Sequence, residues 1–138
     1  MPDVIRFGVS LDKELLTKFD GFIHEKGYSN RSEAIRDLIR EDLVRRQWSV
    51  GEEVAGAITI VYDHHKRGLV ETLTEIQHDN LKMIISSQHV HLDHYNCLEA
   101  LVVKGKPEEV EKLAENLKAV KGVKHSSLTM TTTGRELI

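Results

Sequence analysis

The first fifty residues of this 138-residue chain contain one strand-like segment, followed by two helical segments. In residues 5–11, Phe7, Val9 and Leu11 alternate with polar or small residues, which is the period-two pattern of a strand with one buried face. A lone strand leaves its backbone N–H and C=O groups without partners, so this unit is incomplete by itself. We expect the same strand of a second copy to pair with it in antiparallel orientation, which forms an intertwined dimer.

The two helices that follow this strand have clear start and stop signals. Asp12 stands where an N-cap is expected, and Gly27 ends the first helix. Asn30 and Glu33 have the spacing of a capping box at the start of the second helix, which runs to about Arg46. Apolar residues recur on one face of each helix: Leu15, Leu16, Phe19, Phe22 and Ile23 in the first, and Ala34, Ile35, Leu38, Ile39 and Leu43 in the second.

The paired strands would present a polar ribbon to solvent. Arg6, Gly8 and Ser10 of each copy lie on its outward face, and a two-stranded ribbon of this kind fits the major groove of DNA. The second helices would direct their N-termini, at Asn30 and Arg31, toward flanking phosphates. Because the net charge is −3, any contact with DNA must come from locally placed groups rather than from bulk charge.

Beyond a short connection at residues 48–52, strands and helices alternate. Strands are expected at 54–62, 81–90, 97–103 and 123–132, and helices at 68–78 and 107–120. The order β-α-β-β-α-β matches the ferredoxin-like (ACT-type) fold, in which the helices lie on one face of an antiparallel sheet. The sequence therefore predicts an α+β protein with two domains, at residues 1–48 and 53–138.

Four soft or borderline donors in the second domain have the spacing of a metal site. His89 and His91 are two apart on a strand and leave the same face, and Cys97 returns beside them across a hairpin. His78 ends the preceding helix, and the strand of about ten residues that follows it spans on the order of 30 Å. One chain therefore cannot bring His78 to the other three donors. We expect the fourth donor to come from a second subunit, across an antiparallel pairing of this strand.

The ligand residues alone do not identify the metal. Three imidazoles and one thiolate suit zinc in tetrahedral geometry, and nickel(II) or copper(II) in square-planar geometry. Gln77 and Glu99 stand beside the ligands and are candidates for orienting the imidazoles or lining the interface. Four further histidines are interpreted as surface or loop residues: His64, His65, His94 and His125. Of these, His64 is a candidate for binding a secondary metal when the metal is in excess.

The chain resembles a known family over essentially its whole length. Residues 6–11 and 27–36 resemble a ribbon-helix-helix DNA-binding domain, and the Asn-Arg-Ser-Glu-Ala-Ile stretch at 30–35 resembles the nickel-responsive transcriptional repressors. The four donors also fall on that family's His, His-x-His and Cys positions. The resemblance implies nickel(II), one per subunit, bound across the subunits of a homotetramer (a dimer of dimers). It also implies repression of nickel uptake genes at a palindromic operator in double-stranded DNA.

The resemblance also implies a contact with the DNA backbone and a second cation site, and the chain departs from the family pattern at one residue. Members of the family use a basic loop against the DNA backbone, and Lys66 and Arg67 occupy that loop here. They also hold a second, weaker cation, for which Glu33 and Asp37, four apart on one helical face, are candidates. Without the resemblance, these two carboxylates would be interpreted as ordinary solvated charges. The departure is Gly8, which stands where a base-reading side chain is expected, so shape readout would supplement direct contacts.

Several function classes are disfavoured. Four protein ligands leave no open position for a substrate, so we expect no enzyme. A single cysteine fits a reducing compartment, and no apolar run reaches membrane-spanning length, so we expect a cytoplasmic protein with no membrane partner. Three alternatives stay open: a nickel storage or delivery protein, a metal hydrolase with water in place of one ligand, and a regulator of the same fold that senses another metal or a small molecule.

Overall fold

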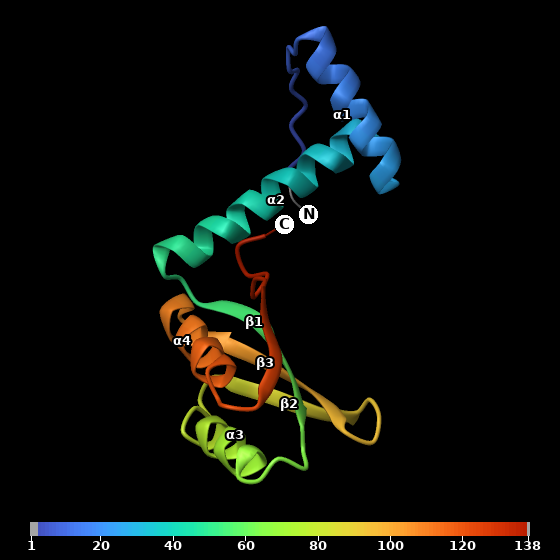
Figure 1. The fold of residues 1–138 in the computed structure, drawn as a ribbon. Helices are drawn as coiled ribbons and strands as arrows, with labels where there is room; N and C mark the ends of the chain where they lie inside the picture. Colours follow the sequence, from blue (N-terminus) through green and yellow to red (C-terminus); the bar gives the residue numbers. More distant parts are fainter. Residues whose placement is uncertain (1–2, 138) are drawn as a thin grey trace. The chain divides into compact units, whose positions relative to one another are not determined.

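The computed structural model describes residues 3–137, and the chain divides into two compact units. Among the described residues, the first unit contains residues 3–43 and 136–137, and the second runs from Val44 to Arg135. Figure 1 shows the elements, which in chain order are α1 (Lys13–Lys26), α2 (Arg31–Val50), β1 (Val54–Asp63), α3 (Leu69–His78), β2 (Ile84–His91), β3 (Asn96–Gly105), α4 (Pro107–Lys118) and β4 (Val123–Met130).

Both helices begin at the predicted residues, and α1 also ends at the predicted one. The Asp12 carboxylate accepts the backbone N–H of Glu14 at 2.8 Å and caps α1. Gly27 ends α1 with φ of 75°, a left-handed conformation that glycine adopts without steric penalty. At the start of α2, the Asn30 side chain accepts the N–H of Glu33 at 2.9 Å. Local sequence therefore determines both helix starts.

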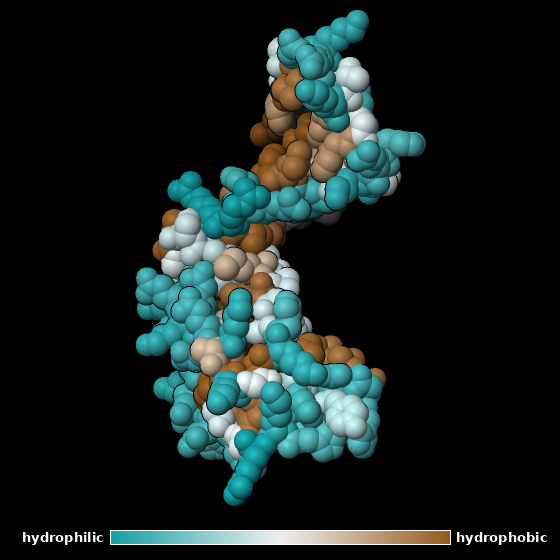
Figure 2. Space-filling view, viewed as in Figure 1, coloured by the Kyte–Doolittle hydropathy of each residue, from teal (hydrophilic) through white to brown (hydrophobic). Residues whose placement is uncertain are grey.

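The N-terminal segment does not form the predicted strand within one chain. Residues 3–12 contain no strand, and the side chains of Phe7, Val9 and Leu11 are 73 %, 59 % and 41 % exposed. Among residues 3–43, only Ala34 is buried, and Figure 2 shows hydrophobic residues at the surface of this unit. A strand needs a neighbouring strand for its backbone hydrogen bonds, so the predicted pairing with a second copy stays a prediction.

The second unit has the predicted ferredoxin-like architecture. Its four strands form an antiparallel sheet in the order β2-β3-β1-β4, and α3 and α4 cover one face (Figure 1). Along β1, every second side chain is buried against these helices. The core between sheet and helices includes Val54, Ile58, Ile60, Tyr62, Leu69, Leu73, Cys97, Leu101, Val103, Val110, Leu113 and Leu117.

The other face of the sheet carries apolar side chains and no helix. Register and alternation place Val90 of β2 and Leu98, Ala100 and Val102 of β3 on this face. Val90 and Val102 are 41 % and 44 % exposed, and Leu98 and Ala100 are only partly buried. An apolar sheet face of this kind is typical of a surface that packs against another subunit.

The predicted connection at residues 48–52 is wrong at its start, because α2 continues through Val50. Trp48 is buried in the second unit, and its indole N–H donates to the carbonyl of Thr131 at 2.8 Å. The Thr132 hydroxyl donates to the Gln47 side chain at 2.8 Å. These contacts extend the helix beyond the point where the apolar pattern weakens. Within residues 3–137, neither α2 nor any other helix combines the length and apolar character needed to cross a membrane.

Candidate metal centre

The β2–β3 hairpin brings three of the four predicted ligands to one end of the sheet. The antiparallel register pairs His91 with Cys97, and His89 with Glu99. The Cys97 Sγ atom lies 3.4 Å from His91 Nδ1, and the rings of His89 and His91 are centred 5.1 Å apart. The thiol is fully buried, whereas His91 is exposed. The hairpin alone therefore places one sulfur and two imidazoles in the same neighbourhood.

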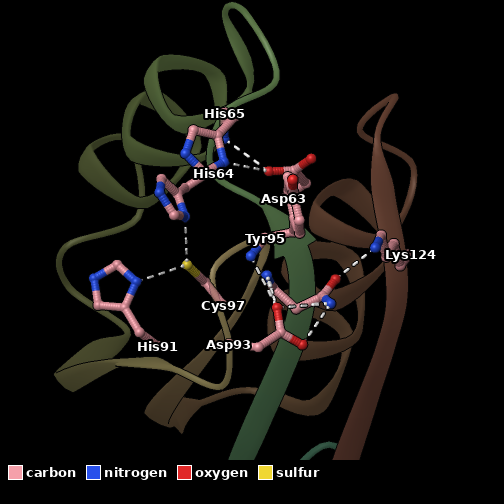
Figure 3. A network of polar contacts seen from close by, with 9 residues as sticks. Asp63, His64, His65, His91, Asp93, Tyr95, Cys97 and Lys124 are labelled. Carbon is pink, nitrogen blue, oxygen red and sulfur yellow. Dashed lines mark hydrogen bonds and ion pairs between the residues drawn. The ribbon is translucent and has the colours of Figure 1, made fainter.

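A polar loop fixes the turn of this hairpin. One carboxylate oxygen of Asp93 accepts the backbone N–H groups of Tyr95 and Asn96, both at 2.8 Å, as Figure 3 shows. The Asn96 side-chain amide donates to the other oxygen at 2.9 Å. These hydrogen bonds, led by those from Asn96, lower the pKa of Asp93 below its usual value. Asp93 stays ionised at neutral pH and holds the chain so that β3 begins one residue before Cys97.

His78 lies apart from these donors. It is the last residue of α3 and lines a surface groove with Asn80, Met83 and Lys112, between the end of α3 and α4. Within residues 3–137, the donors that lie within 4.8 Å of one another near the thiol are those of His64, His91 and Cys97, and they include neither His78 nor His89. The prediction that His78 joins the other donors only across two subunits stays a prediction.

Gln77 and Glu99, predicted to support the site, are joined to each other. The Gln77 amide donates to Glu99 Oε1 at 3.2 Å, and the Tyr62 hydroxyl donates to Glu99 Oε2 at 3.3 Å. Burial, followed by the charge of Glu99 and this hydrogen bond, raises the pKa of Tyr62. Glu99 stands opposite His89 in the register, so the carboxylate that Gln77 holds lies on the same face of the sheet as His89.

His64, interpreted from the sequence as a surface residue, lies against the thiol. Its Nδ1 atom is 3.0 Å from Cys97 Sγ, and Figure 3 shows His64 and His91 both directed at the sulfur. The Asp63 carboxylate accepts the N–H of His65 at 2.9 Å, which turns the chain just after β1. Burial, followed by repulsion from His65 and His91, lowers the pKa of His64 and favours the neutral imidazole that can bind metal.

A sequence signal for His64 did exist. The alternation that buries Ile58, Ile60 and Tyr62 in β1 extends to His64, which is partly buried and lies one residue after the end of the strand. However, only the β1–β3 register, which pairs Tyr62 with Cys97, shows that this face ends at the thiol. Pairing between strands far apart in the chain could not be obtained from spacing.

The donor set suits a late first-row divalent metal. One thiol and several imidazole nitrogens are the ligands that nickel(II), copper(II) and zinc prefer over carboxylate or water. The sulfur is buried, with His64 Nδ1 and His91 Nδ1 beside it. Because the thiolate is the form that binds metal, binding a cation there requires loss of the thiol proton. The residues present therefore fit a nickel ion, with Cys97 and His91 at the centre of the set.

The residues predicted to contact DNA have different surroundings. Arg6, Gly8 and Ser10 lie in the exposed N-terminal segment. Arg31 makes a two-pronged salt bridge with Asp20 of α1, with both N–O distances 2.9 Å. The hydrogen bond from Arg31 is the main cause of the lowered pKa of Asp20. The Arg31 side chain therefore joins α1 to α2, and only its remaining donors are available to a phosphate.

The other predicted contacts are exposed or already partnered. Lys66 and Arg67 are exposed in the turn between β1 and α3. In α2, Asp37 accepts the Tyr28 hydroxyl at 2.9 Å and pairs with Arg40 at 3.4 Å. Glu33 and Asp37 form no group of three or more donors within residues 3–137. A cation at this point would have to compete with the existing partners of Asp37.

Comparisons with known proteins identify the family. Residues 55–131 match the model described as the NikR C-terminal nickel-binding domain, and residues 5–46 match that of the ribbon-helix-helix proteins of the CopG family. A relative from Geobacter sulfurreducens, named as a nickel-responsive regulator, is 62% identical over 138 residues, covering 99% of each chain. The chain belongs to the nickel-responsive regulator family.

Further similarities agree with this assignment. A relative in Pyrococcus furiosus that is also named as a nickel-responsive regulator is 57% identical over 136 residues, covering 98% of this chain and 99% of that one. Among solved structures, an uncharacterized protein from Thermotoga maritima matches 56% of this chain and 96% of its own, with a TM-score of 0.51 and 18% identity. The last similarity concerns the fold alone.

Membership of the nickel-responsive regulator family confirms the main predictions. The α+β architecture, with a ribbon-helix-helix unit followed by a ferredoxin-like domain, is that of the family. The chain is a nickel-responsive regulator with a DNA-binding unit and a nickel-binding domain. The family consists of transcription regulators, so the expectation that the chain is not an enzyme is also confirmed.

Proposed function

We propose that this protein is a nickel-dependent repressor of nickel uptake genes, in which metal bound across subunits controls binding to the operator. Each subunit contributes one nickel(II) site made of three histidines and one cysteine: His89, His91 and Cys97 of one subunit, and His78 of the partner subunit. The observation that carries the proposal is the β2–β3 register, which places His91 beside a buried thiol in a nickel-binding domain. The resemblance of the four positions to the family's ligands supports the same assignment.

A partner subunit supplies what one chain lacks. His78 ends α3, away from the thiol, while Gln77 beside it bonds to Glu99 across from His89. The bare apolar face of the sheet, which includes Val90 and Val102, offers a surface on which two such domains can pack. These features support a homotetramer in which nickel-binding domains form the centre and each pair of N-terminal units forms one DNA-binding head.

The first unit supports a dimeric DNA-binding head. Phe7, Val9 and Leu11 are exposed in one chain and would be buried between two paired strands. Pairing turns Arg6 and Ser10 outward, where they can reach base edges of a palindromic operator in double-stranded DNA. We propose that Gly8, Asn30 and Arg31 approach the DNA backbone there, and that Lys66 and Arg67 add phosphate contacts from the second unit. A weaker cation at Glu33 and Asp37 would require their present partners to move.

Nickel acts by stabilising one arrangement of the DNA-binding heads relative to the others. A bound ion raises operator affinity only to the extent that it binds one arrangement better than the others. Ligands drawn from two subunits give the ion such a preference, because it can be fully coordinated only when the subunits are held together. The regulator would work in the cytoplasm, where a free thiol stays reduced.

Replacing the thiol tests the site. Cys97→Ala should abolish the nickel-dependent gain in operator affinity while leaving the oligomer assembled, as measured by gel shift with and without nickel and by sedimentation. Cys97→Ser, which keeps the size of the side chain, guards against a packing defect, since Cys97 is fully buried. A full nickel response in either variant would exclude Cys97 as a ligand.

Mixing variants tests whether the site spans two subunits. His78→Ala and Cys97→Ala subunits each lack one ligand, and each should fail to respond to nickel alone. In mixed oligomers, a Cys97→Ala subunit can supply His78 to a site whose other three ligands come from a His78→Ala subunit. Nickel titration of the mixture should therefore recover a fraction of the sites. Recovery of none, in oligomers shown by mass spectrometry to be mixed, would argue against shared ligation.

A further inference from the structure

The last turns of α2 belong to the second unit, and one face of the helix holds them there. Among residues 44–50, only Val44, Gln47 and Trp48 are not exposed. Gln47 and Trp48 are 7 % and 8 % exposed, and Val44 packs against the core of the second unit. Residues three and four apart lie on one side of a helix, so the three side chains form a single contact surface. We call these three residues the α2 anchor.

The α2 anchor is bonded to the chain segment that follows β4. The indole N–H of Trp48 donates to the carbonyl of Thr131 at 2.8 Å, and the Thr132 hydroxyl donates to the Gln47 side-chain oxygen at 2.8 Å. The backbone N–H of Thr131 donates in turn to the carbonyl of Ala55 at 3.0 Å, which joins this segment to β1. Release of the anchor would therefore expose apolar surface and break two hydrogen bonds of buried side chains.

Gly56 of β1 lies where the indole ring meets the sheet. A Cβ atom at this position would be 3.7 Å from the ring of Trp48 and only 2.9 Å from the carbonyl oxygen of Thr129. The second distance is too short for a Cβ contact, so any other residue would displace β4 from β1. The missing side chain lets the ring lie close to the β1–β4 pair. The second unit is therefore shaped to receive Trp48 at this point.

The α2 anchor leaves the opposite side of the helix available. At about 100° per residue, its three side chains lie opposite the apolar residues of the earlier turns. Those residues are expected to pack between two copies of the first unit, and they are Ala34, Ile35, Leu38, Ile39 and Leu43. Figure 1 shows α2 as one unbroken helix from Arg31 to Val50. A single element therefore combines a dimerisation face in its earlier turns with an anchor on the opposite face at its end.

We propose that Trp48 and Gln47 are positioning residues for nickel-dependent operator binding. Only residues 51–53 connect α2 to β1, and the anchor removes the freedom that this short connection would otherwise give the helix. A change in the arrangement of the second units is then passed along α2 to Asn30 and Arg31 at its start. This role rests on the proposed function, because the anchor transmits the nickel-dependent gain in operator affinity.

The α2 anchor lies far along β1 from the proposed metal ligands. Gly56 contacts Trp48, whereas Tyr62, six residues further on, pairs with Cys97. At about 3.3 Å per residue, roughly 20 Å of strand separates these two positions. A substitution in the anchor should therefore change the coupling between nickel and DNA without changing nickel binding. This combination of results distinguishes a positioning role from a defect in the metal site.

Operator affinity measured with and without nickel tests this role in the full chain. In Trp48→Ala, the nickel-dependent gain in affinity should fall by at least about fivefold, while nickel affinity and the nickel absorption spectrum match those of the parent. Gln47→Ala, which leaves the indole in the core, should lower the gain by a smaller factor and guards against a packing defect. Val50→Ala, at a side chain that is 56 % exposed in the same turn, is the matched control and should change neither quantity. An undiminished gain in both Trp48→Ala and Gln47→Ala overturns the proposal.

The fluorescence of Trp48, the only tryptophan of the chain, reports on the anchor without any substitution. Its emission maximum and its quenching by acrylamide should indicate a buried indole in the free, nickel-loaded and operator-bound protein. If operator binding makes Trp48 more accessible to acrylamide, the anchor opens in the complex and does not transmit the nickel response.

Cys97→Ala separates this role from the proposed function. A full nickel response in Cys97→Ala would remove the proposed function, and the role of the anchor with it. Loss of the response in Cys97→Ala, together with an undiminished gain in Trp48→Ala and Gln47→Ala, would remove the role of the anchor alone.

Discussion

The two units of this chain are incomplete in different ways. In the second unit, Ile58, Leu101 and Leu117 are fully buried by contacts within one chain. In the first unit, Phe7 and Leu15 are 73 % and 54 % exposed, and Ala34 is the only buried residue among positions 3–43. One chain therefore provides the regulatory unit with a finished core, and it leaves the DNA-binding unit without one.

The polar groups show the opposite pattern. The first unit satisfies its polar residues locally, through the Asp12 and Asn30 caps and the Asp20–Arg31 pair. The second unit has a finished core, but one chain does not complete the proposed metal site, because His78 is not among the donors near Cys97 within residues 3–137. In the proposed assembly, association with another copy completes a core in the first unit and the set of metal ligands in the second. This difference predicts that substitutions in the two units will fail in different measurements.

The largest effect is expected from truncating the finished core. Leu101→Ala removes a fully buried side chain from the middle of the sheet and should lower the free energy of unfolding by about 3 kcal/mol. The matched substitution Leu38→Ala removes a side chain that is 44 % exposed in one chain, so its effect should depend on dimerisation and change with protein concentration. Chemical denaturation at several protein concentrations measures both. Equal, concentration-independent losses would contradict the contrast between the units.

The second-largest effect is expected in the first unit, whose apolar side chains are exposed in one chain. Phe7→Asp places a charge where the paired strands would bury an aromatic ring, and it should weaken operator binding at least about 100-fold, or about 2.8 kcal/mol. Nickel binding, measured by absorption, should be unchanged. Arg6→Ala, one position away on the outward face, should leave the dimer intact and weaken specific DNA binding by about 1–3 kcal/mol. A Phe7→Asp protein that still binds its operator would rule out the intertwined ribbon.

Features carried by short stretches of sequence could be predicted, and those set by long-range contacts could not. The caps at Asp12 and Asn30 and the hairpin that pairs His91 with Cys97 depend on neighbours a few residues away. The end of α2 was placed too early because it depends on the contact between Trp48 and Thr131, 83 residues apart. His64 was missed for the same reason, since its contact with Cys97 spans 33 residues.

One strand boundary is an exception, because a local turn rather than a long-range contact moves it. The apolar residues from position 81 onward predict a strand, yet β2 begins at Ile84. The Asn80 side chain donates to the carbonyl of Ile76 at 2.7 Å, and the Asn80 carbonyl accepts the N–H of Met83 at 3.1 Å. The chain therefore turns through residues 79–83 before it enters the sheet. An apolar pattern cannot distinguish a turn of this kind from the first residues of a strand.

A smaller effect is expected in the second unit, at the hydrogen bond between Tyr62 and Glu99. Tyr62→Phe keeps the buried ring and removes a hydroxyl that donates to Glu99 at 3.3 Å, so it should lower the free energy of unfolding by about 1 kcal/mol. Because Gln77 still holds Glu99, the nickel absorption spectrum should change little. Tyr95→Phe, at a ring that is 60 % exposed, is the control. A lost nickel spectrum in Tyr62→Phe would show that the hydroxyl positions the ligands as well as stabilising the fold.

The smallest effect is expected in the first unit, at the pair that joins α1 to α2. The hydrogen bond from Arg31 lowers the pKa of Asp20 in the folded state, so the unfolded chain binds the proton more readily. The pair therefore stabilises the fold above the ordinary aspartate pKa of about 3.9, and this contribution disappears as pH falls through the lower folded value.

Asp20→Asn should thus lower the thermal midpoint slightly at neutral pH and leave it unchanged at strongly acidic pH. Glu14→Gln is the matched control on the same helix, since Glu14 makes only a single, highly exposed contact with Lys18 at 3.2 Å. Circular dichroism from pH 7 down to the acid limit follows both variants. A difference in thermal midpoint between Asp20→Asn and the parent that persists at the lowest pH would mean that Asp20 stabilises the fold through packing. The charge pair with Arg31 would then contribute less to the stability of the first unit than we infer.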